Sequence, residues 1–248
     1  MGHSKRVYRY GLKPANMSSF NITIKETDLW IAVNSSVLEE EPELLQQLEQ
    51  FVWQQRRVLE EYIKKDPLFF KSIYPYMAGT DAPRIAKEMA KAANLAGVGP
   101  MAAVAGAFAQ FVGQWLLQKS PEVIVENGGD IFIRSNYIQK VGVFAGESPF
   151  SEKLAVTIPP SRDPLGICTS SSTVGPSLSF GKVDAAVSIA TSSTLADAAA
   201  TAAGNMVYSE EDLTPAMDFA LSIVGVKGAL VILGDKMAVR GDIQLSAP

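Results

Sequence analysis

Pairs of short apolar strands alternate with pairs of helices along this chain, and that order limits the folds open to it. Apolar and polar residues alternate over 19–25 and a compact apolar run fills 28–34, which predicts a hairpin. A second hairpin is expected around Asn127–Asp130, where two glycines between apolar runs can adopt positive φ. Further strands are expected at 140–145, 153–158, 185–191 and within 224–241.

Helical spacing of apolar residues predicts helices between these strand pairs. The expected helices cover 37–65, 81–97, 98–118, 194–207 and 210–221. We expect Asp81 to cap the second of them, with Pro83 in its first turn. The third is nearly uncharged, but a proline, two glutamines and several glycines favour a buried helix over a membrane span.

Regular alternation of single strands with single helices is absent, so a doubly wound parallel sheet is not expected. The predicted fold class is α+β in layers. No linker interrupts the pattern, so residues 1–248 are expected to form one domain, with an internal duplication of halves 16–120 and 121–248. Residues 1–15 are expected to be a loosely ordered arm, and their lack of a secretory apolar stretch predicts a cytoplasmic protein.

The charge and the scarce reactive residues exclude several function classes. The chain has 22 basic and 26 acidic residues without a basic block, which argues against a nucleic-acid partner. Its single cysteine, Cys168, rules out an internal disulfide and a cysteine-rich zinc site. Its single histidine, His3, lies near the N-terminus, which rules out Ser-His-Asp and Cys-His catalysis. Carboxylates, hydroxyls, lysines and backbone groups remain for any chemistry.

The segment SSTLADAAATAAGN holds the best functional clue. Asp197 and Thr201 stand four residues apart on an alanine-rich helix and therefore share a face. A carboxylate with a hydroxyl offers the hard oxygen ligands that Mg²⁺ takes when it also binds a phosphate. The same residues also fit a helix start, with Thr194 as cap and Asp197 at the third helical position, and the sequence leaves both interpretations open.

Two loop-like segments are candidates for binding a ligand. Asn127, Gly128, Gly129 and Asp130 predict either a tight turn or a bare backbone against which a flat or phosphorylated ligand lies. Thr169, Ser170, Ser171 and Ser172 form a run of hydroxyls that suits a phosphate or a solvated loop. No Walker A or GxGxxG sequence occurs. Asp184 is a second carboxylate before an expected strand, and Cys168 is expected to be a structural thiol.

Taken in order, GVGPMAAVAGAFA, ENGGDIFI, GICTSSS and SSTLADAAATAAGN resemble an uncharacterised prokaryotic ApbE-like family related to the FAD:protein FMN transferases. The resemblance spans residues 19–207 and includes KETDLWI near the start. It implies two related T-fold-like halves with a ligand site between them. It also implies that Asp197 and Thr201 bind Mg²⁺ and that a backbone carbonyl near Val104–Ala105 completes the set of metal ligands. By the same resemblance, FAD is lined by residues Asn127–Asp130 and Thr169–Ser172.

The chain departs from the transferases where their catalysis takes place. They carry a histidine-containing HxIDP-like segment, whereas this chain has SFGKVDAA, and they commonly have Lys-Gly at Ala105 and Gly106. Losing a positioned acid or base typically costs ~10² to 10⁴ in rate. We therefore expect binding of FAD or a related nucleotide diphosphate with Mg²⁺ and weak or altered activity, with Asp184 as a candidate base.

Two other functions stay open on the sequence alone. The first is an active transfer of FMN, or a related nucleotide, to a Ser or Thr of an acceptor protein. The second is a structural protein that forms a homo-oligomer through its small-residue helices and carries a vestigial pocket.

Overall fold

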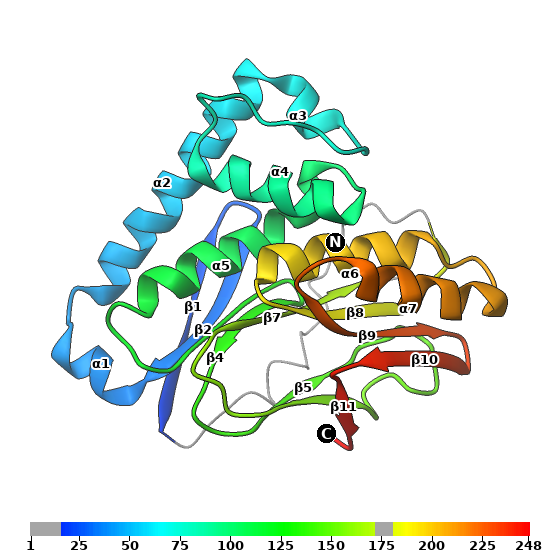
Figure 1. Cartoon of the computed structure of the whole chain (residues 1–248). Helices are drawn as coiled ribbons and strands as arrows, with labels where there is room; N and C mark the ends of the chain where they lie inside the picture. The colour runs from blue at the N-terminus through cyan, green and yellow to red at the C-terminus, as the bar shows by residue number, and fades with distance from the viewer. Residues whose placement is uncertain (1–15, 172–180) are drawn as a thin grey trace.

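The computed structural model describes residues 16–171 and 181–248, and its centre is one antiparallel sheet (Figure 1). The eight strands lie in the order β1-β2-β3-β4-β7-β8-β9-β10, and every neighbouring pair is antiparallel. Their bounds are β1 Met17–Ile24, β2 Thr27–Asn34, β3 Val123–Asn127, β4 Asp130–Arg134, β7 Leu165–Ser170, β8 Ala185–Ala190, β9 Val226–Leu233 and β10 Lys236–Gly241.

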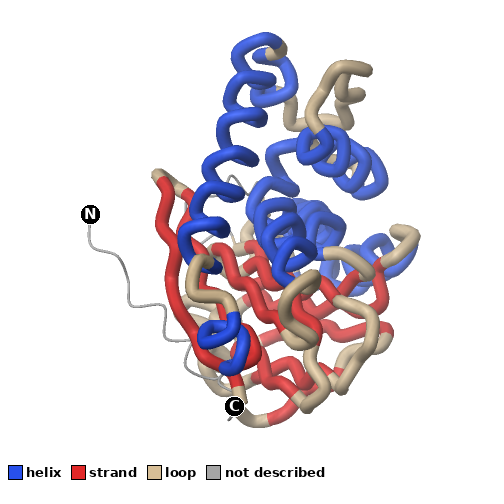
Figure 2. Tube along the Cα trace, turned by 90° about the vertical axis from the view of Figure 1, so that its left-hand side faces the viewer, coloured by secondary structure: helices blue, strands red, loops and turns tan. Residues whose placement is uncertain are grey.

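Helices cover one face of this sheet and a small second sheet covers part of the other (Figures 1 and 2). The small sheet has the order β11-β6-β5, with β5 at Gln139–Gly142, β6 at Ala155–Ile158 and β11 at Gln244–Ser246. The helical segments are α1 Ser35–Glu40, α2 Leu44–Lys65, α3 Pro67–Lys71, α4 Arg84–Ala96, η2 Pro100–Ala103, α5 Val104–Leu116, α6 Ser193–Asn205, η3 Glu210–Asp212 and α7 Leu213–Ser222. The α+β prediction is confirmed.

The connectivity of the large sheet occurs twice. Strands β1 and β2 lead through α1–α5 to β3 and β4, and β7 and β8 lead through α6 and α7 to β9 and β10. In this order β3 and β4 belong to the first round, together with β1 and β2. The predicted boundary between residues 120 and 121 would instead place β3 and β4 in the second half. That the two rounds are duplicated T-fold-like halves remains a proposal.

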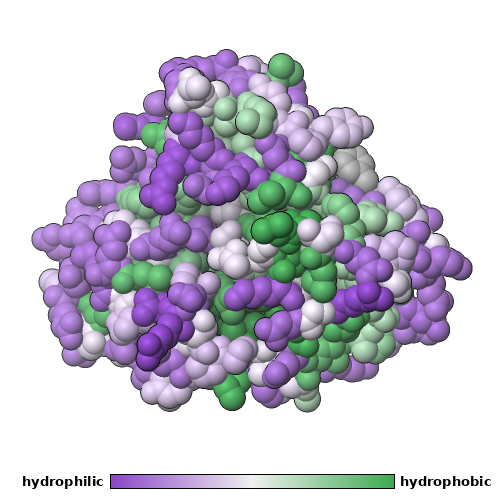
Figure 3. Space-filling model, viewed as in Figure 1, coloured by the Kyte–Doolittle hydropathy of each residue, from purple (hydrophilic) through white to green (hydrophobic). Residues whose placement is uncertain are grey.

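Strands in the middle of the sheet are apolar on both faces because both faces are covered. In β4, Ile131 and Ile133 pack toward the small sheet, while Phe132 packs among residues of α2 and α5. At the surface, by contrast, hydrophilic residues dominate the flanks of the molecule and apolar residues gather near its middle (Figure 3). Burial on both faces explains why Val123, Ile124 and Val125 of β3 are consecutive apolar residues, before the buried polar pair Glu126 and Asn127.

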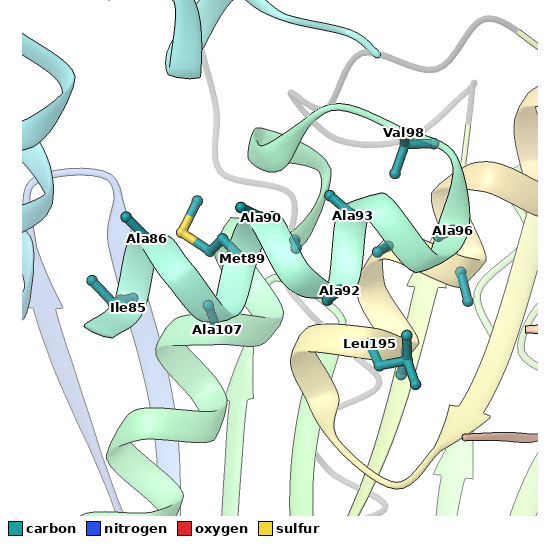
Figure 4. Close-up of a cluster of buried hydrophobic side chains, with 14 of the residues drawn as sticks. Ile85, Ala86, Met89, Ala90, Ala92, Ala93, Ala96, Val98, Ala107 and Leu195 are labelled. Carbon is teal, nitrogen blue, oxygen red and sulfur yellow. The ribbon is translucent and has the colours of Figure 1, made fainter. Parts of the chain in front are cut away.

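Small residues let the helices α4, α5 and α6 approach one another closely. The buried side of α4 is built from alanines with Ile85 and Met89, and Ala107 of α5 and Leu195 of α6 complete the same cluster (Figure 4). Glycine is required where α6 meets β7, because a Cβ on Gly166 would lie 2.3 Å from the Ser193 backbone. The small residues of α6 thus pack against other elements of the same chain.

Several helix boundaries differ from the prediction. The segment 37–65 is two helices, α1 and α2, because Pro42 lacks the N–H that a helix interior needs. Asp81 does not cap α4, which begins after Pro83 without a side-chain cap bond. Gly97 does end α4, with φ of 74° in the left-handed region.

Strand β7 was missed, since residues 165–170 contain a glycine and the start of a hydroxyl run that favours loop. The uncharged segment 98–118 is η2 followed by α5, both largely buried. Within the described part of the chain, no single helix is long and apolar enough to cross a membrane, and α4 and η2–α5 pass only as a pair bent by 103°.

Substituting Gly166 by Ala should lower the free energy of unfolding by about 1–3 kcal/mol, because the new methyl group overlaps backbone that cannot move aside. Gly204→Ala in α6 is the matched control, since its nearest contact is a Val183 methyl at 3.1 Å and alanine favours helix. Denaturant unfolding of both variants checks this. A Gly166→Ala protein as stable as the control would contradict the close contact between β7 and α6.

Candidate functional site

A row of polar side chains crosses the sheet beneath α5 and α6. Asn127, Asp130, Cys168 and Ser188 stand opposite one another on β3, β4, β7 and β8. Side chains opposite each other in an antiparallel sheet share a face, and Cys168 packs in the core under the helices. The row therefore points toward the helices, where an apolar surface would otherwise be expected.

The first turn of α5 lies between this row and α6. The Gly106 N–H donates to Asp197 Oδ2 at 2.8 Å, and Asn127 Nδ2 donates to the Ala105 carbonyl at 3.0 Å. Helix α5 has no side-chain cap of its own at Ala103. Asp197 therefore supplies the cap from another helix, at the end of α5 where a negative charge is favoured.

The contact between α5 and α6 depends on Gly106 and on a buried polar pair. A Cβ on Gly106 would lie 2.2 Å from the Ser193 carbonyl oxygen and 2.7 Å from the Cβ of Asp197. Ser193 Oγ donates to the Gly106 carbonyl at 2.9 Å, and the Ser193 N–H donates to Gln110 Oε1 at 2.9 Å. These bonds tie the first turns of α5 to the start of α6, while the peptide that donates to Asp197 is held on its carbonyl side by Asn127.

Two carboxyl groups in this site are strongly affected by their surroundings. Removal from water raises the pKa of Asp197 to about 7, although backbone N–H groups of Gly106 and Ala105 favour its charged form. Burial and, next, the charge of Asp197 raise the pKa of Asp130 well above its ordinary value, while a hydrogen bond with Cys168 lowers it. The two carboxyls thus lie close enough to repel each other.

Cys168 is a structural thiol, as its lack of a histidine partner predicted. Burial, followed by the charges of Asp130 and Asp197, raises its pKa, so it stays protonated. Its thiol donates to the Ser193 carbonyl at 3.3 Å and also has the Asp130 carboxylate within reach. The thiol thereby joins β4, β7 and α6 beside the two carboxyls.

The start of α6 differs from the capping box that the sequence allowed. Ser192 is the cap, and its hydroxyl accepts from the Leu195 N–H at 3.2 Å. Thr194 lies inside the helix with a buried hydroxyl that has no hydrogen-bond partner among the described residues. Asp197 is therefore beyond the capping positions of its own helix, which removes the helix-start explanation for it.

Thr201 lies one turn after Asp197 on α6 and is buried. The hairpin turn was predicted correctly: Gly128 and Gly129 have φ of 69° and 106°, and the Gly129 N–H donates to Glu126 Oε1 at 2.7 Å. The structure therefore brings Asp197 close to Asp130 and, through the Ala105–Gly106 peptide, to Asn127, while Thr201 shares the helix face of Asp197. It also places Asp130 beside Asp197 and not in a solvated turn.

The hydroxyl run divides between the faces of the sheet. Thr169 and Ser170 belong to β7, where alternation puts Ser170 on the helix face with Cys168 and turns Thr169 away. Ser171 follows the strand and is buried. Ser172 lies outside the described residues. The interpretation of Thr169–Ser171 as a solvated loop was wrong.

Asp184 does not join the other candidates. It precedes β8, and its Oδ2 accepts from the Gly234 N–H at 2.7 Å, in the turn between β9 and β10. Four residues separate it from Ser188, which is about 13 Å along an extended strand. Its hydrogen bond with Gly234 therefore stabilises the turn between β9 and β10.

Sequence reasoning missed Ser188, Ser193 and Gln110. Ser188 has a fully buried hydroxyl without a hydrogen-bond partner in the described residues. Gln110 stood out only as a polar residue within an uncharged helix. A buried glutamine amid alanines was the available signal, but its partner Ser193 is 83 residues away.

The donor set limits what the site can bind. Among residues 16–171 and 181–248, no group of three or more His, Cys, Asp and Glu side chains could hold a metal ion. A cation here would rely on carboxylate oxygens of Asp197 and Asp130, the Thr201 hydroxyl and the Ala105 carbonyl, an all-oxygen set that suits Mg²⁺. Two hollows of about 170 and 150 Å³ lie elsewhere on the molecule and are lined by other residues.

Comparison with known proteins identifies the family. A family model described as AbpE bacteria matches residues 11–235. The chain belongs to this family. It is 44% identical over 191 residues to a UPF0280 protein of Methanocella arvoryzae, covering 77% of this chain and 78% of that protein. It is 38% identical over 230 residues to a UPF0280 protein of Methanococcus vannielii, covering 91% of each.

Solved structures of ApbE proteins show the same fold as this family member. The ApbE protein of Thermotoga maritima matches with a TM-score of 0.52 and 14% identity, over 91% of this chain and 96% of that one. The flavin transferase ApbE of Vibrio cholerae matches with a TM-score of 0.50 and 15% identity, over 92% and 97%. The predicted ApbE-like resemblance is confirmed.

The raised pKa of Asp197 predicts a loss of stability as pH rises. Its folded-state pKa of about 7 exceeds the ordinary 3.8, so its protonated form stabilises the fold at low pH and this contribution disappears as pH rises through 7. With divalent cations chelated, Asp197→Asn should gain stability relative to wild type, on the order of 1–2 kcal/mol, between pH 5 and pH 8.

Asp212→Asn is the control for that series. The pKa of Asp212 is lowered by N–H groups of Tyr208 and Ser209, so its titration lies below pH 4. Its stability difference from wild type should stay flat from pH 5 to 8. Chemical denaturation at each pH measures both, and a flat Asp197→Asn series would show that Asp197 is ionised as in water.

Proposed function

We propose that this protein binds FAD, or a related nucleotide diphosphate, together with Mg²⁺ at the first turn of α5. The observation that carries the proposal is the placement of that turn between Asp197 and the row of Asn127 and Asp130. The site combines oxygen ligands, backbone groups and two carboxyls from four separate elements, β3, β4, α5 and α6. Such convergence of distant polar residues in a buried place is typical of a binding site.

A divalent cation would relieve the electrostatic strain in the site. Asp197 and Asp130 form no ion pair with a basic side chain among the described residues, and each raises the cost of charging the other. Buried carboxylates usually pair with cations or become protonated. Asp197 and Thr201, with the Ala105 carbonyl, would hold Mg²⁺, which when bound polarises a pyrophosphate.

The nucleotide would lie along the turn at Asn127–Asp130. Gly128 and Gly129 leave bare backbone there, and a Cβ on Gly128 would meet nothing within 4 Å. Ser170 and Ser171, with Thr169, lie at the neighbouring end of β7, since the Thr169 N–H donates to the Gly129 carbonyl at 3.3 Å. The Ser170 and Ser171 hydroxyls would bind phosphate or ribose oxygens, whereas the Thr169 side chain faces the other side of the sheet.

The same residues support binding more than fast catalysis. Transfer of FMN to a Ser or Thr breaks the pyrophosphate bond, releases AMP and requires a group that takes the hydroxyl proton. The chain has one histidine, His3, and Asp184 accepts a backbone hydrogen bond in a turn away from Asp197. We therefore propose weak or altered activity, with an active transferase as the alternative that the shared fold supports.

Thermal unfolding should show stabilisation by FAD that requires Mg²⁺. At a hundredfold excess over Kd, binding to the folded state adds ~2.7 kcal/mol, which is several degrees in Tm for a chain of this size. Asp197→Asn should remove the Mg²⁺-dependent part, since it loses the charge but keeps an oxygen to accept from Gly106. Asp197→Ala is less informative because it also removes the cap of α5.

Asp163→Asn is the matched control, because Asp163 is exposed in the loop before β7 and should respond to Mg²⁺ and FAD like wild type. FMN and ADP, each with and without Mg²⁺, test which part of the ligand is recognised. Stabilisation that survives Asp197→Asn would reject this metal site. No stabilisation by any of the three would reject the proposed ligand class.

Release of AMP from FAD separates weak from efficient transfer. With Mg²⁺ and an acceptor protein present, we expect a rate at least ~10²-fold below that of the Vibrio cholerae flavin transferase, because residues 16–171 and 181–248 contain no histidine to take the hydroxyl proton. Chromatography of AMP and intact mass of the acceptor give the two readouts. Comparable rates with a stable FMN mass increment would establish the active transferase instead.

A further inference from the structure

An apolar projection stands above the body of the molecule, formed by α3 and the connection from Ser72 to Pro83. It lies at the top in Figures 1 and 2, next to the C-terminal end of α2 and above α4. We call this projection, residues 67–83, the apex. Nothing in the proposed ligand site uses it.

The apex exposes large apolar side chains. Those more than 45% exposed on the apex and on adjacent α4 are Leu68, Phe70, Ile73, Tyr74, Met77 and Leu95. Leu68 and Phe70 lie on opposite sides of α3, so at most five of the six share a face, and if each is given the 150–250 Å² of an aromatic side chain these five present roughly 600 Å². That exceeds the few hundred Å² of an ordinary surface patch and approaches the ~800 Å² that each partner contributes to a stable interface.

The segments that carry these side chains touch one another, although Leu68 and Phe70, two residues apart on α3, point to opposite sides of that helix. Asn94 of α4 contacts the Met77 sulfur at 3.2 Å and accepts from the Tyr76 N–H at 2.9 Å, beside Leu95. A Cβ on Gly99 would lie 2.8 Å from the Ile73 Cα. The patch therefore continues from α3 through the connection to the end of α4.

The apex is held rigidly in its exposed position. Tyr62 and Tyr76 both donate to the Asp66 carboxylate, and the Gly79 N–H donates to the Tyr62 hydroxyl at 2.9 Å. Phe69 is fully buried between the rings of Tyr62 and Tyr76. A surface fixed in this way loses little conformational entropy when a partner covers it.

Charge and area together favour a second copy of this chain as the partner. The apex, residues 67–83, has two charged residues, Lys71 and Asp81, whose charges cancel, although the whole chain carries a net charge of −4. In a twofold dimer the same patch of both copies meets, so a patch with net charge would repel its copy. The near-neutral apex avoids that repulsion. Aromatic residues and methionine are also enriched in the centres of interfaces.

We infer that the apex and the adjacent end of α4 form the interface of a homodimer. The interface is independent of the proposed nucleotide site, since none of its residues lies among the candidate ligands. Its area, near neutrality and rigidity fit a self-complementary contact between two copies.

Light scattering coupled to size exclusion tests this inference on the full chain at about 1–100 µM. Wild type should have twice the 26.6 kDa mass of one chain. Leu68→Glu and Met77→Glu should each weaken association at least tenfold and give monomers at the lower concentrations. Ile138→Glu is the control, because Ile138 is 64% exposed like Leu68 at 63% but lies near the small sheet, and it should remain dimeric.

Circular dichroism and cooperative unfolding should be unchanged in all three variants, since each residue is exposed. A wild-type monomer at 100 µM would overturn the inference, whether the patch then binds a different protein or none. Dimers that persist in both Leu68→Glu and Met77→Glu would also overturn it. Loss of association in Ile138→Glu alone would move the interface to the small sheet.

Discussion

The close approach of α5 to α6 is the constraint on which the rest of the site depends. Gly106 permits it, because any side chain there would overlap the Ser193 carbonyl oxygen. The approach delivers the Asp197 carboxylate to the uncapped first turn of α5, where it accepts from the Gly106 N–H. The same turn of α5 positions Asn127, whose side-chain amide donates to the Ala105 carbonyl. One helix contact therefore joins the two rounds of the sheet and collects the polar groups of the site.

This arrangement stores an unfavourable interaction that a ligand can relieve. Asp130 and Asp197 are held close together and away from water, and both resist ionisation. A protein selected for stability alone would more easily place apolar residues there, since replacing buried charged groups is often neutral or stabilising. A cation and a phosphate that complete the site would offset the unfavourable burial of the two carboxyls. Family membership and the shared ApbE fold agree with this account, while the lack of a positioned histidine separates binding from efficient transfer.

Periodic patterns in the sequence were sufficient for the layers but not for the contacts. The hairpin at Gly128–Gly129 and the end of α4 at Gly97 followed from local turn chemistry, which neighbouring residues determine. Strand β7 was missed because its hydroxyls favour loop locally, and only pairing with β4 and β8 makes it a strand. The capping of α5 by Asp197 and the Gln110–Ser193 pair join residues that only the fold brings together.

The most direct test of the central claim is the position of a bound cation. A crystal grown with Mn²⁺ and ADP, measured for anomalous scattering, would locate the ion without any assumption about the reaction. The account predicts a peak ~2.2 Å from a carboxylate oxygen of Asp197, near the Thr201 hydroxyl and the Ala105 carbonyl. A peak elsewhere, or ADP bound while Asp197 keeps only its contact with α5, would make Asp197 a structural cap and contradict the proposed site.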